Sequence, residues 1–463
     1  MRAALAAIAL AGCYSPSPAP GSPCTAAGRC PEGLECRNDV CELPGVVGDD
    51  AARGDAADAP DACAGTCDGN TLLSCDQQVT VCSDGCTDLP VAHCKQLKPS
   101  NGITLALLEG TTANMSGDRW TFYTDTGQIR SGAQTVRAAG LGVISGINFQ
   151  IVDEAGVFAM TSFSLPDNER LDTNGSRPLV LFAATTIDIS GELDGSATVG
   201  QPGPGGSTSN TNTNVGSGCR GRAGRLLSTQ HGEGGGGGGG ATAGGNGGPS
   251  NAASPTGIGG ELCASRSTTR PLRGGAAGGA GGASDLNSGG PGGGAVMLLA
   301  LQSITISLTG SVSVSGGGGR SGAGGTVGSG EGGGGGGAGG AILLEARTIT
   351  VNGALIANGG GGAAPRTDSG TNGSDNAITA AAGGTYTSNG GTAHGGAGGA
   401  RNTGPGNGET YNYNDGLGTA TSTWSLGGGG GGAVGRIELR AEMLDMPSNV
   451  ISPAPMTNAP EYE

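Results

Sequence analysis

Residues 180–193 read Val-Leu-Phe-Ala-Ala-Thr-Thr-Ile-Asp-Ile-Ser-Gly-Glu-Leu, and residues 342–355 repeat the pattern as Ile-Leu-Leu-Glu-Ala-Arg-Thr-Ile-Thr-Val-Asn-Gly-Ala-Leu. Apolar residues alternate in both copies, which predicts strands with one buried face. The two-residue step between Ala346 and Ile349 breaks the alternation and predicts a corner, so that the strands on both sides point apolar residues inward. Gly353 predicts a second turn with a positive φ, which glycine adopts without strain.

The two copies align without a gap, and the pattern recurs twice more. The matched positions of the first strand are Val180 with Ile342, Phe182 with Leu344, and Ala184 with Ala346. A looser copy runs over 293–312 and a truncated one over 431–441. No copy can bury its apolar face alone, so the copies must stack. We therefore expect an all-β fold, a parallel β-helix or solenoid over 96–446, with rungs about 4.8 Å apart.

Long glycine-rich insertions separate the copies at 195–293, 315–340 and 357–432. Helices are disfavoured there, since each internal glycine costs about 1 kcal/mol relative to alanine. We expect flexible loops that leave the solenoid at one corner. The alternative is that the glycine runs pack as extended helices without side chains, hydrogen-bonded to one another as the chains of collagen are. These runs are 234–240, 332–337 and 427–432.

The composition limits both the core and the partners of the protein. Glycine occupies 101 of 463 positions, aromatic residues make up 3 %, and charged residues make up 13 %. This does not suit an ordinary globular domain with a large, aromatic-rich core. The chain has 23 Lys and Arg against 38 Asp and Glu. Nucleic acid is therefore a disfavoured partner, because phosphate binding needs a basic face.

The first residues of the chain predict its location. Leu-Ala-Gly-Cys at 10–13 follows a basic Arg2 and a short apolar run, which is the layout of a bacterial secretory signal. It resembles a lipobox, the site at which lipoproteins are acylated on cysteine and cut before it. We expect a signal peptide over 1–12, a lipid on Cys13, and a Pro/Ser tether over 13–23. Two or three acyl chains hold a protein firmly to a membrane.

Besides Cys13 the chain has an even number of cysteines, which in an exported protein predicts disulfides. Zinc is the alternative, but no Cys-x-x-Cys pair occurs and the histidines are scattered. We expect a small cysteine knot over 24–41, an acidic flexible linker over 42–62, a second cysteine-rich module over 63–95 and a proline-containing tail over 447–463. A bridge within the first insertion suggests some order there. The disulfide candidates are Cys24, Cys30, Cys36, Cys41, Cys63, Cys67, Cys75, Cys82, Cys86, Cys94, Cys219 and Cys263.

No catalytic motif is found: the chain has no Walker loop, no Gly-x-Ser-x-Gly elbow and no His-Glu-x-x-His pair. His231 and His394 lie in glycine-rich tracts, where a solvated side chain is expected. The outward acidic residues Asp188, Glu192 and Asp194 are the only candidates for a polysaccharide-active enzyme, and solvated strand positions explain them more simply. We expect no catalytic residue, no metal site and no cofactor.

A late group of aromatic residues suggests a binding surface. Tyr411, Tyr413 and Trp424 lie close together in the third insertion, and such side chains stack on sugar rings. More often, such a group anchors a loop on its scaffold. Polysaccharide binding is therefore the alternative to a structural or adhesive role.

Cysteine, proline and glycine recur in a particular order: Cys-Pro-Glu-Gly-Leu-Glu-Cys at 30–36, a Cys-Asp-Gly module from Cys67, and Pro-Ser-Asn-Gly at 99–102 before the repeats. The chain resembles the glycine-rich, cysteine-knotted lipoproteins of myxobacteria. Its composition is similar to PE-PGRS-like surface proteins, and its repeat resembles the rungs of hemagglutinin-like β-helices. The resemblance implies a lipid-anchored, non-catalytic protein of the cell envelope, with a structural or adhesive role by analogy. Tyr14 after the lipid cysteine, in place of aspartate, favours the outer membrane by the sorting logic of enteric bacteria. Its partners would be the lipid bilayer and surface polysaccharide or other envelope proteins.

Overall fold

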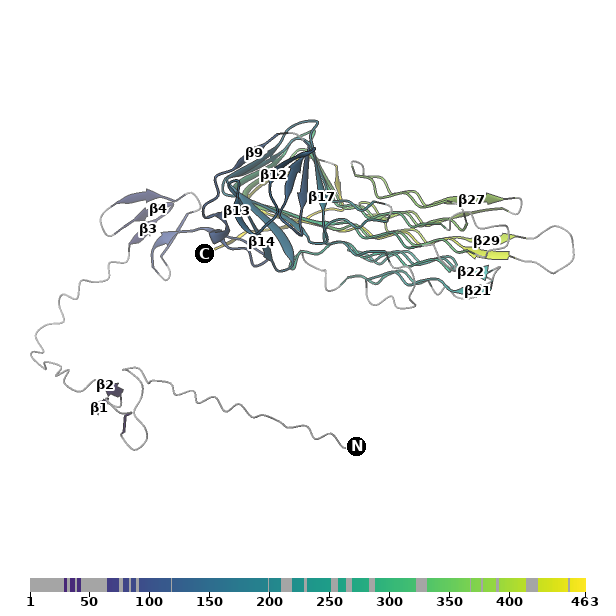
Figure 1. Ribbon diagram of the computed structural model, residues 1–463, viewed down its shortest axis with the longest axis horizontal. Helices are drawn as coiled ribbons and strands as arrows, with labels where there is room; N and C mark the ends of the chain where they lie inside the picture. Colours follow the sequence, from purple (N-terminus) through teal and green to yellow (C-terminus); the bar gives the residue numbers. More distant parts are fainter. Residues whose placement is uncertain are drawn as a thin grey trace, which may run out of the picture. The chain divides into compact units, whose positions relative to one another are not determined.

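The structure is a computed structural model that describes most of the chain beyond residue 64 (Figure 1). The described residues are 29–30, 34–37, 40–42, 65–74, 78–82, 85–88, 91–117, 119–198, 200–209, 219–228, 231–250, 257–263, 269–282, 288–321, 331–366, 368–375, 378–388, 391–413, 424–448 and 450–463. The expected signal peptide, Cys13, the tether and most of the acidic linker lie outside these residues, as do Cys24, Cys63 and Cys75.

The chain divides into two compact units. The first comprises Met1–Gly65 with Ser74–Gln77. Its β1 (Glu35–Arg37) pairs antiparallel with β2 (Val40–Glu42), and Cys30 and Cys36 each take part in a disulfide. The second unit comprises Thr66–Leu73 with Gln78–Glu463.

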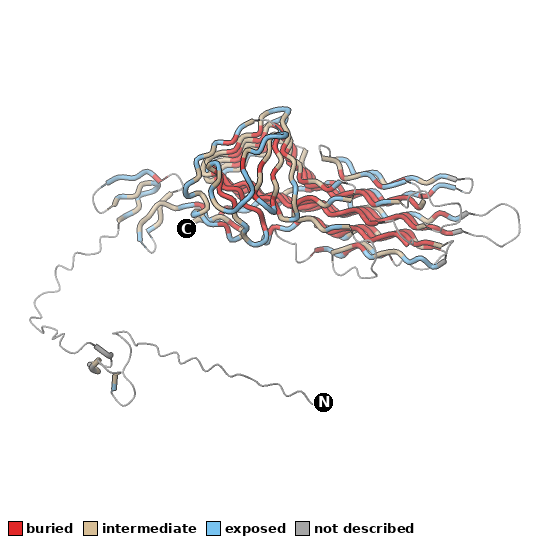
Figure 2. The backbone as a smooth tube through the Cα atoms, viewed as in Figure 1, coloured by how far each residue is buried: buried red, intermediate tan, exposed pale blue. Residues whose placement is uncertain are grey.

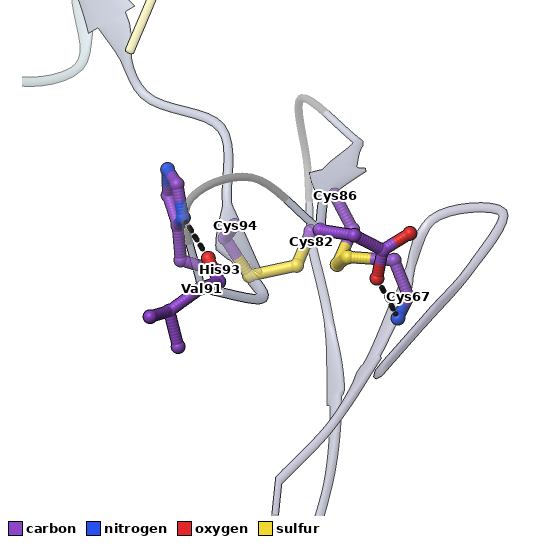
Figure 3. Close-up of a disulfide and its surroundings, with 7 residues drawn as sticks. Cys67, Cys82, Cys86, Val91, His93 and Cys94 are labelled. Carbon is purple, nitrogen blue, oxygen red and sulfur yellow. Dashed lines mark hydrogen bonds between the residues drawn. A yellow bond between two sulfur atoms is a disulfide. The ribbon is translucent and has the colours of Figure 1, made fainter. Parts of the chain in front are cut away.

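The second unit begins with a small cysteine-rich module. Two disulfides hold it, Cys67–Cys86 and Cys82–Cys94, and both lie close together beside His93 (Figure 3). Both bridges confirm the use of these cysteines expected from the sequence. The strands are β3 (Thr66–Asp68), β4 (Thr71–Leu73) and β5 (Val79–Val81) in one antiparallel sheet, and β6 (Cys86–Thr87) with β7 (His93–Cys94) in another.

The body of the second unit is nearly all-β, with mixed sheets in which parallel pairs dominate. Three ladders of parallel strands run through it. The first ladder contains β15 (Ala155–Met160), β18 (Leu179–Ala183), β23 (Ala295–Ile306), β25 (Ala341–Val351), β31 (Arg436–Arg440) and β34 (Met456–Asn458). The second contains β9 (Asn114–Ser116), β16 (Ser162–Leu165), β19 (Thr186–Ile189), the later halves of β23 and β25, and β32 (Met443–Asp445). The third contains β10 (Trp120–Tyr123), β17 (Arg170–Asn174), β20 (Glu192–Asp194), β24 (Ser311–Ser313), β26 (Ala354–Ile356) and β33 (Ile451–Ser452).

Antiparallel strands and one short 3-10 turn, η1 (Leu105–Leu108), complete the amino-terminal side of the body. The added strands are β11 (Ile129–Ser131) and β12 (Gln134–Arg137) beside β10, and β13 (Gly142–Ile144) and β14 (Ile147–Val152) beside β15. The residues that lead into the body meet the carboxy-terminal residues, because β8 (Leu97–Lys98) pairs with β35 (Glu461–Tyr462). The carboxy-terminal tail expected over 447–463 contains three short strands, β33, β34 and β35.

The repeat exists, but its first strand is shifted by one residue from the alignment made on the sequence. Val296 of β23 is the register partner of both Leu179 and Ile342, so Leu179, rather than Val180, occupies the position equivalent to Ile342. The cause is a one-residue register shift between β23 and β25, after Ala300. The ungapped alignment therefore assigns the earlier side chains of β18 to the wrong face, and Val180 and Phe182 lie on the face opposite to Ile342 and Leu344.

The expected corner at Ala346–Ile349 lies inside the uninterrupted strand β25, although both sides of the step contribute to the same core. The expectation of a positive φ at Gly353 is wrong. A Cβ atom at Gly353 would instead lie under 3.0 Å from the carbonyl oxygens of Ser307 and Gly310. Glycine is needed there because the backbones of successive copies approach closely.

Two buried clusters fill the body (Figure 2). The larger lies between the ladders and includes Phe122, Phe158 and Phe163, with ring centroids of Phe122 and Phe158 4.9 Å apart. The smaller covers the other face of the first ladder and includes Val180, Phe182 and Met297. Because both faces of β15, β18 and the first half of β23 are buried, these strands are apolar at every position rather than at alternate positions.

The glycine-rich insertions are packed into an ordered array in the part that the structure describes, and the preference for flexible loops is wrong there. We call this array the glycine bundle. Its backbone groups are hydrogen-bonded between segments, and most of its glycines are buried (Figure 2). The segments are 219–225, 233–248, 257–263, 274–282, 289–294, 315–320, 331–340, 357–364, 368–373, 381–384, 394–399, 404–409 and 427–435.

Candidate functional site

Three glycine segments form the centre of the bundle and bond to one another in a cycle. Gly238 N donates to Gly336 O at 2.8 Å, Gly336 N donates to Gly430 O at 2.8 Å, and Ala433 N donates to Gly238 O at 2.9 Å. The same cycle occurs three residues earlier, from Gly235 through Gly333. A repeat of three residues between parallel segments is the geometry of an extended threefold helix, as proposed in the alternative interpretation of the sequence.

The bundle requires glycine because its segments lie too close together to leave room for a Cβ atom. A Cβ atom on Gly335 would lie under 3.0 Å from the carbonyl oxygen of Gly236, and one on Gly429 would meet Gly334 in the same way. None of the central glycines has a positive φ. Glycine is thus selected by the close approach of backbones, and not by an unusual backbone conformation.

Asparagine side chains take part in the hydrogen bonding of the array, and their Oδ1 atoms accept from backbone N–H groups. The Oδ1 atom of Asn372 accepts from Gly318 N at 3.0 Å, and that of Asn246 accepts from Gly259 N at 2.9 Å. The Oδ1 atom of Asn407 accepts from Asn246 N at 2.8 Å. Each side-chain amide takes the place of a backbone carbonyl.

The Cys219–Cys263 disulfide joins two segments of the bundle. It confirms the expectation that these cysteines pair within the first insertion and that the insertion has order. The bridge closes a sequence separation of 44 residues. Arg436 reaches the same place from the body, with Nη2 3.3 Å from Cys263 O and 3.4 Å from Gly240 O. Burial lowers the pKa of the Arg436 guanidinium.

Hairpins lie at the far end of the glycine segments, at the right of Figure 1. A four-stranded sheet has the order β21 (Leu226–Ser228), β22 (His231–Gly232), β30 (Trp424–Gly427) and β29 (Thr410–Tyr413). A separate hairpin contains β27 (Thr385–Ser388) and β28 (Gly391–His394). The bundle therefore places side-chain-bearing strands at the end of a nearly side-chain-free support.

The aromatic residues expected to bind sugar are only partly brought together. Tyr411 is 3 % exposed and packs against Tyr386, with ring centroids 5.1 Å apart, and against Leu426. It anchors its hairpin, which leaves no ring face for a sugar. Tyr413 and Trp424 are register partners across β29 and β30, while their side chains lie outside the described part of the structure.

Neither histidine of the glycine tracts forms part of a cluster of metal ligands. His394 is exposed and its Nδ1 atom lies 3.1 Å from Thr385 Oγ1. His231 is partly buried in β22. Among the described residues, no group of three or more His, Cys, Asp and Glu side chains is placed to hold a metal ion.

Two of the three outward acidic candidates form one charged cluster on the third ladder. Arg170 of β17 contacts Asp172 at 2.6 Å and Glu192 at 2.9 Å, and it also pairs with Asp194. Asp188 lies apart on β19, where its carboxylate accepts from Thr186 Oγ1 at 3.3 Å. An arginine shared by three carboxylates is typical of a structural ion-pair network.

Asp375 from the third insertion extends this cluster. No pattern in the sequence indicated that Asp375 would lie there. Its carboxylate accepts from Ser313 Oγ at 3.2 Å. Burial raises the pKa of Asp194, and Asp375 raises it further, while the Ser196 amide and Arg170 act in the opposite direction. Burial also raises the pKa of Asp375. Raised carboxyl pKa values occur at acid–base sites and in buried structural networks alike.

A second charged cluster is buried within the body, and no sequence pattern singled it out. Glu345 accepts from Ser100 Oγ at 2.6 Å and pairs with Arg440 at 2.8 Å, and both charged side chains are nearly inaccessible. Glu438 accepts from Thr269 Oγ1 at 2.6 Å. Burial raises the pKa of Glu345, against the opposing effect of Ser100 and Arg440. The cluster ties residues far apart in sequence to β25 and β31.

Comparison of the chain with protein-family models, curated proteins and solved structures finds no match. Within the described residues, no helix is long and apolar enough to cross a membrane.

Proposed function

We propose that this chain is a non-catalytic, lipid-anchored protein of the cell envelope, in which the body is a parallel β-solenoid and the glycine bundle is a rigid arm for contact or adhesion. The supporting observation is the hydrogen-bonded packing of the glycine segments, which end in hairpins. A flexible loop would not hold a binding surface in place, whereas an array bonded on several sides does.

The solenoid part of the proposal follows from the three parallel ladders. Each passage of the chain adds one strand to each ladder, in the same order. The first of these passages consists of β18, β19 and β20. In the next two, a single long strand serves the first and second ladders and a short one serves the third, as β23 with β24 and β25 with β26 do. The inward residues of successive passages stack, as Leu181, Leu298 and Leu344 do. Stacked passages of this kind support the proposal of a solenoid, since no single passage has a core.

The anchor and the arm are tested together in cells. A short epitope is inserted into residues 414–423, between β29 and β30. The epitope should be accessible to antibody on intact cells. The protein should also fractionate with membranes. Cys13→Ser should abolish labelling by a palmitate analogue and release the protein from membranes. An epitope reached only after lysis, or equal labelling of the variant, would contradict the proposal.

Polysaccharide binding is a second candidate, favoured by the pairing of Tyr413 with Trp424 across two strands at the end of the arm. Cross-strand aromatic residues on one face present neighbouring rings. Loss of glycan-array binding in Tyr413→Ala and Trp424→Ala, with binding kept by Tyr123→Ala in the body, would favour it. Conversely, polysaccharide depolymerisation abolished by Asp194→Asn would favour an enzyme.

A further inference from the structure

One flank of the glycine bundle carries exposed side chains of a particular kind. Segments 219–225 and 257–263 lie side by side there, because Arg222 N donates to Ile258 O at 2.9 Å and a disulfide joins Cys219 to Cys263. Strand β21 continues the first of these segments. We call residues 219–227 with 257–263 the arginine–leucine flank.

Apolar side chains are exposed along this flank. Among the described residues of the bundle and its hairpins, all the large hydrophobic side chains classed as exposed lie here. They are Leu226 (45 % exposed), Leu227 (50 %), Ile258 (44 %) and Leu262 (55 %). An array that otherwise buries or omits its apolar side chains leaves these four exposed, and all four lie on the same two neighbouring segments or the strand that continues one of them.

Arginines accompany these apolar residues. Arg220, Arg222 and Arg225 occupy three of six consecutive positions in a chain whose net charge is −15. None of them forms an ion pair with another described residue. The acidic groups nearby are Glu261, which is exposed on the flank, and Glu233, which is 1 % exposed and accepts from Arg225 N at 3.2 Å. The flank is therefore basic on an acidic molecule.

The backbone geometry aligns the charges. Arg222 and Arg225 are three residues apart in an extended segment whose hydrogen bonds repeat every three residues, as Gly221 N to Ala277 O and Gly224 N to Ala280 O do. Residues at this spacing share one side of such a segment, about 9 Å apart. Arg222 and Arg225 are thus on the same side of the segment, and the backbone of Arg222 is bonded to that of the exposed Ile258.

We propose that the arginine–leucine flank binds the surface of an anionic lipid membrane, with the guanidinium groups on headgroup phosphates and the leucines at the acyl boundary. Phosphates attract arginine, and the interfacial region accommodates separate apolar side chains. A second copy of this chain would bring the same three arginines face to face, and like charges would repel. An acidic polypeptide accounts for the arginines and leaves the separated leucines unexplained.

The inference extends the proposed contact role of the arm, and its test is independent of the lipid anchor. Full-length Cys13→Ser protein is sedimented with phosphatidylcholine vesicles that contain or lack phosphatidylglycerol. Binding should require phosphatidylglycerol and should weaken as salt is raised. Arg222→Gln with Arg225→Gln should lower the partition coefficient roughly fivefold for each arginine removed. Leu226→Ser with Leu227→Ser should lower it roughly tenfold.

Matched variants separate a specific site from general surface effects. Arg119→Gln with Leu308→Ser removes an arginine whose side chain is 71 % exposed and a leucine that is 83 % exposed, both in the body, and should leave binding unchanged. Equal binding to both vesicle types, or an equal loss in this control, would overturn the proposal. Binding to soluble polyglutamate without binding to vesicles would assign the flank to an acidic protein. A dimer in ultracentrifugation that dissociates in Leu226→Ser with Leu227→Ser would assign it to a second copy.

Discussion

The body and the glycine bundle bury their residues by opposite means. The body packs side chains, and residues such as Phe122, Phe163 and Leu344 are fully buried between the ladders. The bundle packs backbones, and its central glycines bond to neighbouring segments in a repeat of three residues. A side-chain core tolerates other apolar residues of similar volume. A backbone core needs glycine at most of the positions where the segments touch, and alanine is the side chain found at the others, as at Ala338 and Ala433.

This difference explains the composition of the chain. Glycine abundance is usually taken as a sign of disorder, because glycine loses the most conformational entropy on folding. Here the many hydrogen bonds between segments offset that loss. The disulfide Cys219–Cys263 also lowers the entropy of the unfolded chain. Low aromatic content is consistent with a molecule in which the glycine bundle packs without large side chains.

The sharpest test is a single side chain placed in the centre of the bundle. In Gly335→Val, the new Cβ atom would lie under 3.0 Å from Gly236 O, so the segments must separate and lose their hydrogen bonds. We expect loss of more than about 3 kcal/mol, at the upper end of overpacking effects. Urea denaturation and amide hydrogen exchange measure it. Gly404→Ala is the matched control, because nothing lies within 4 Å of a Cβ atom there; equal losses would refute the backbone-packing model.

Removal of the bundle's disulfide should have an effect of similar size. Cys219→Ser with Cys263→Ser frees a loop with a sequence separation of 44 residues, which costs about 4 kcal/mol in the chain-entropy model. Amide exchange should rise first in 219–263, while the ladders stay protected. Uniform acceleration across body and bundle would mean that the two regions unfold as one unit.

A cavity in the body should lower the free energy of unfolding by a comparable amount, and its effect should lie in the body rather than in the glycine bundle. Leu344→Ala empties a fully buried position on β25, and such changes typically cost about 3 kcal/mol. Leu308→Ala, at an 83 % exposed position, should cost little. Thermal denaturation of both variants provides the measurement. Similar melting temperatures would show that stacking of side chains contributes little to the body.

The smallest expected effect is on pH dependence. Burial raises the pKa of Asp194 above its value in the unfolded chain. The native state then keeps a proton that the unfolded state has released, so stability falls as pH rises from the ordinary carboxyl pKa to the raised one. Asp194→Asn removes this contribution and should flatten the decline, measured as the urea midpoint across acidic pH. An unchanged slope would argue that the cluster titrates as it does in the unfolded chain.

Several features could be predicted from the sequence, and particular residues show why others could not. The repeat at 342–355, the β-structure and the pairing of Cys219 with Cys263 follow from local patterns. The register of 180–193 could not be predicted from such patterns. β23 contains one residue more than β25, and a comparison of β18 with β25 without gaps does not reveal it. Asp375 joined Asp194 only because an insertion returns to the third ladder. Tyr411 matched the pattern of a sugar-binding residue, yet its ring is buried against Tyr386.

The sequence alone determined that strands alternate, that copies must stack and that cysteines pair, since these depend on side-chain period and on the count of residues. Only the tertiary structure decided the state of the glycine tracts. An isolated glycine segment has no side chains that favour one conformation, and its hydrogen bonds form only with other segments. The partners of Gly238, for example, are Gly336 and Ala433, about a hundred and two hundred residues away, and no local pattern encodes such a meeting.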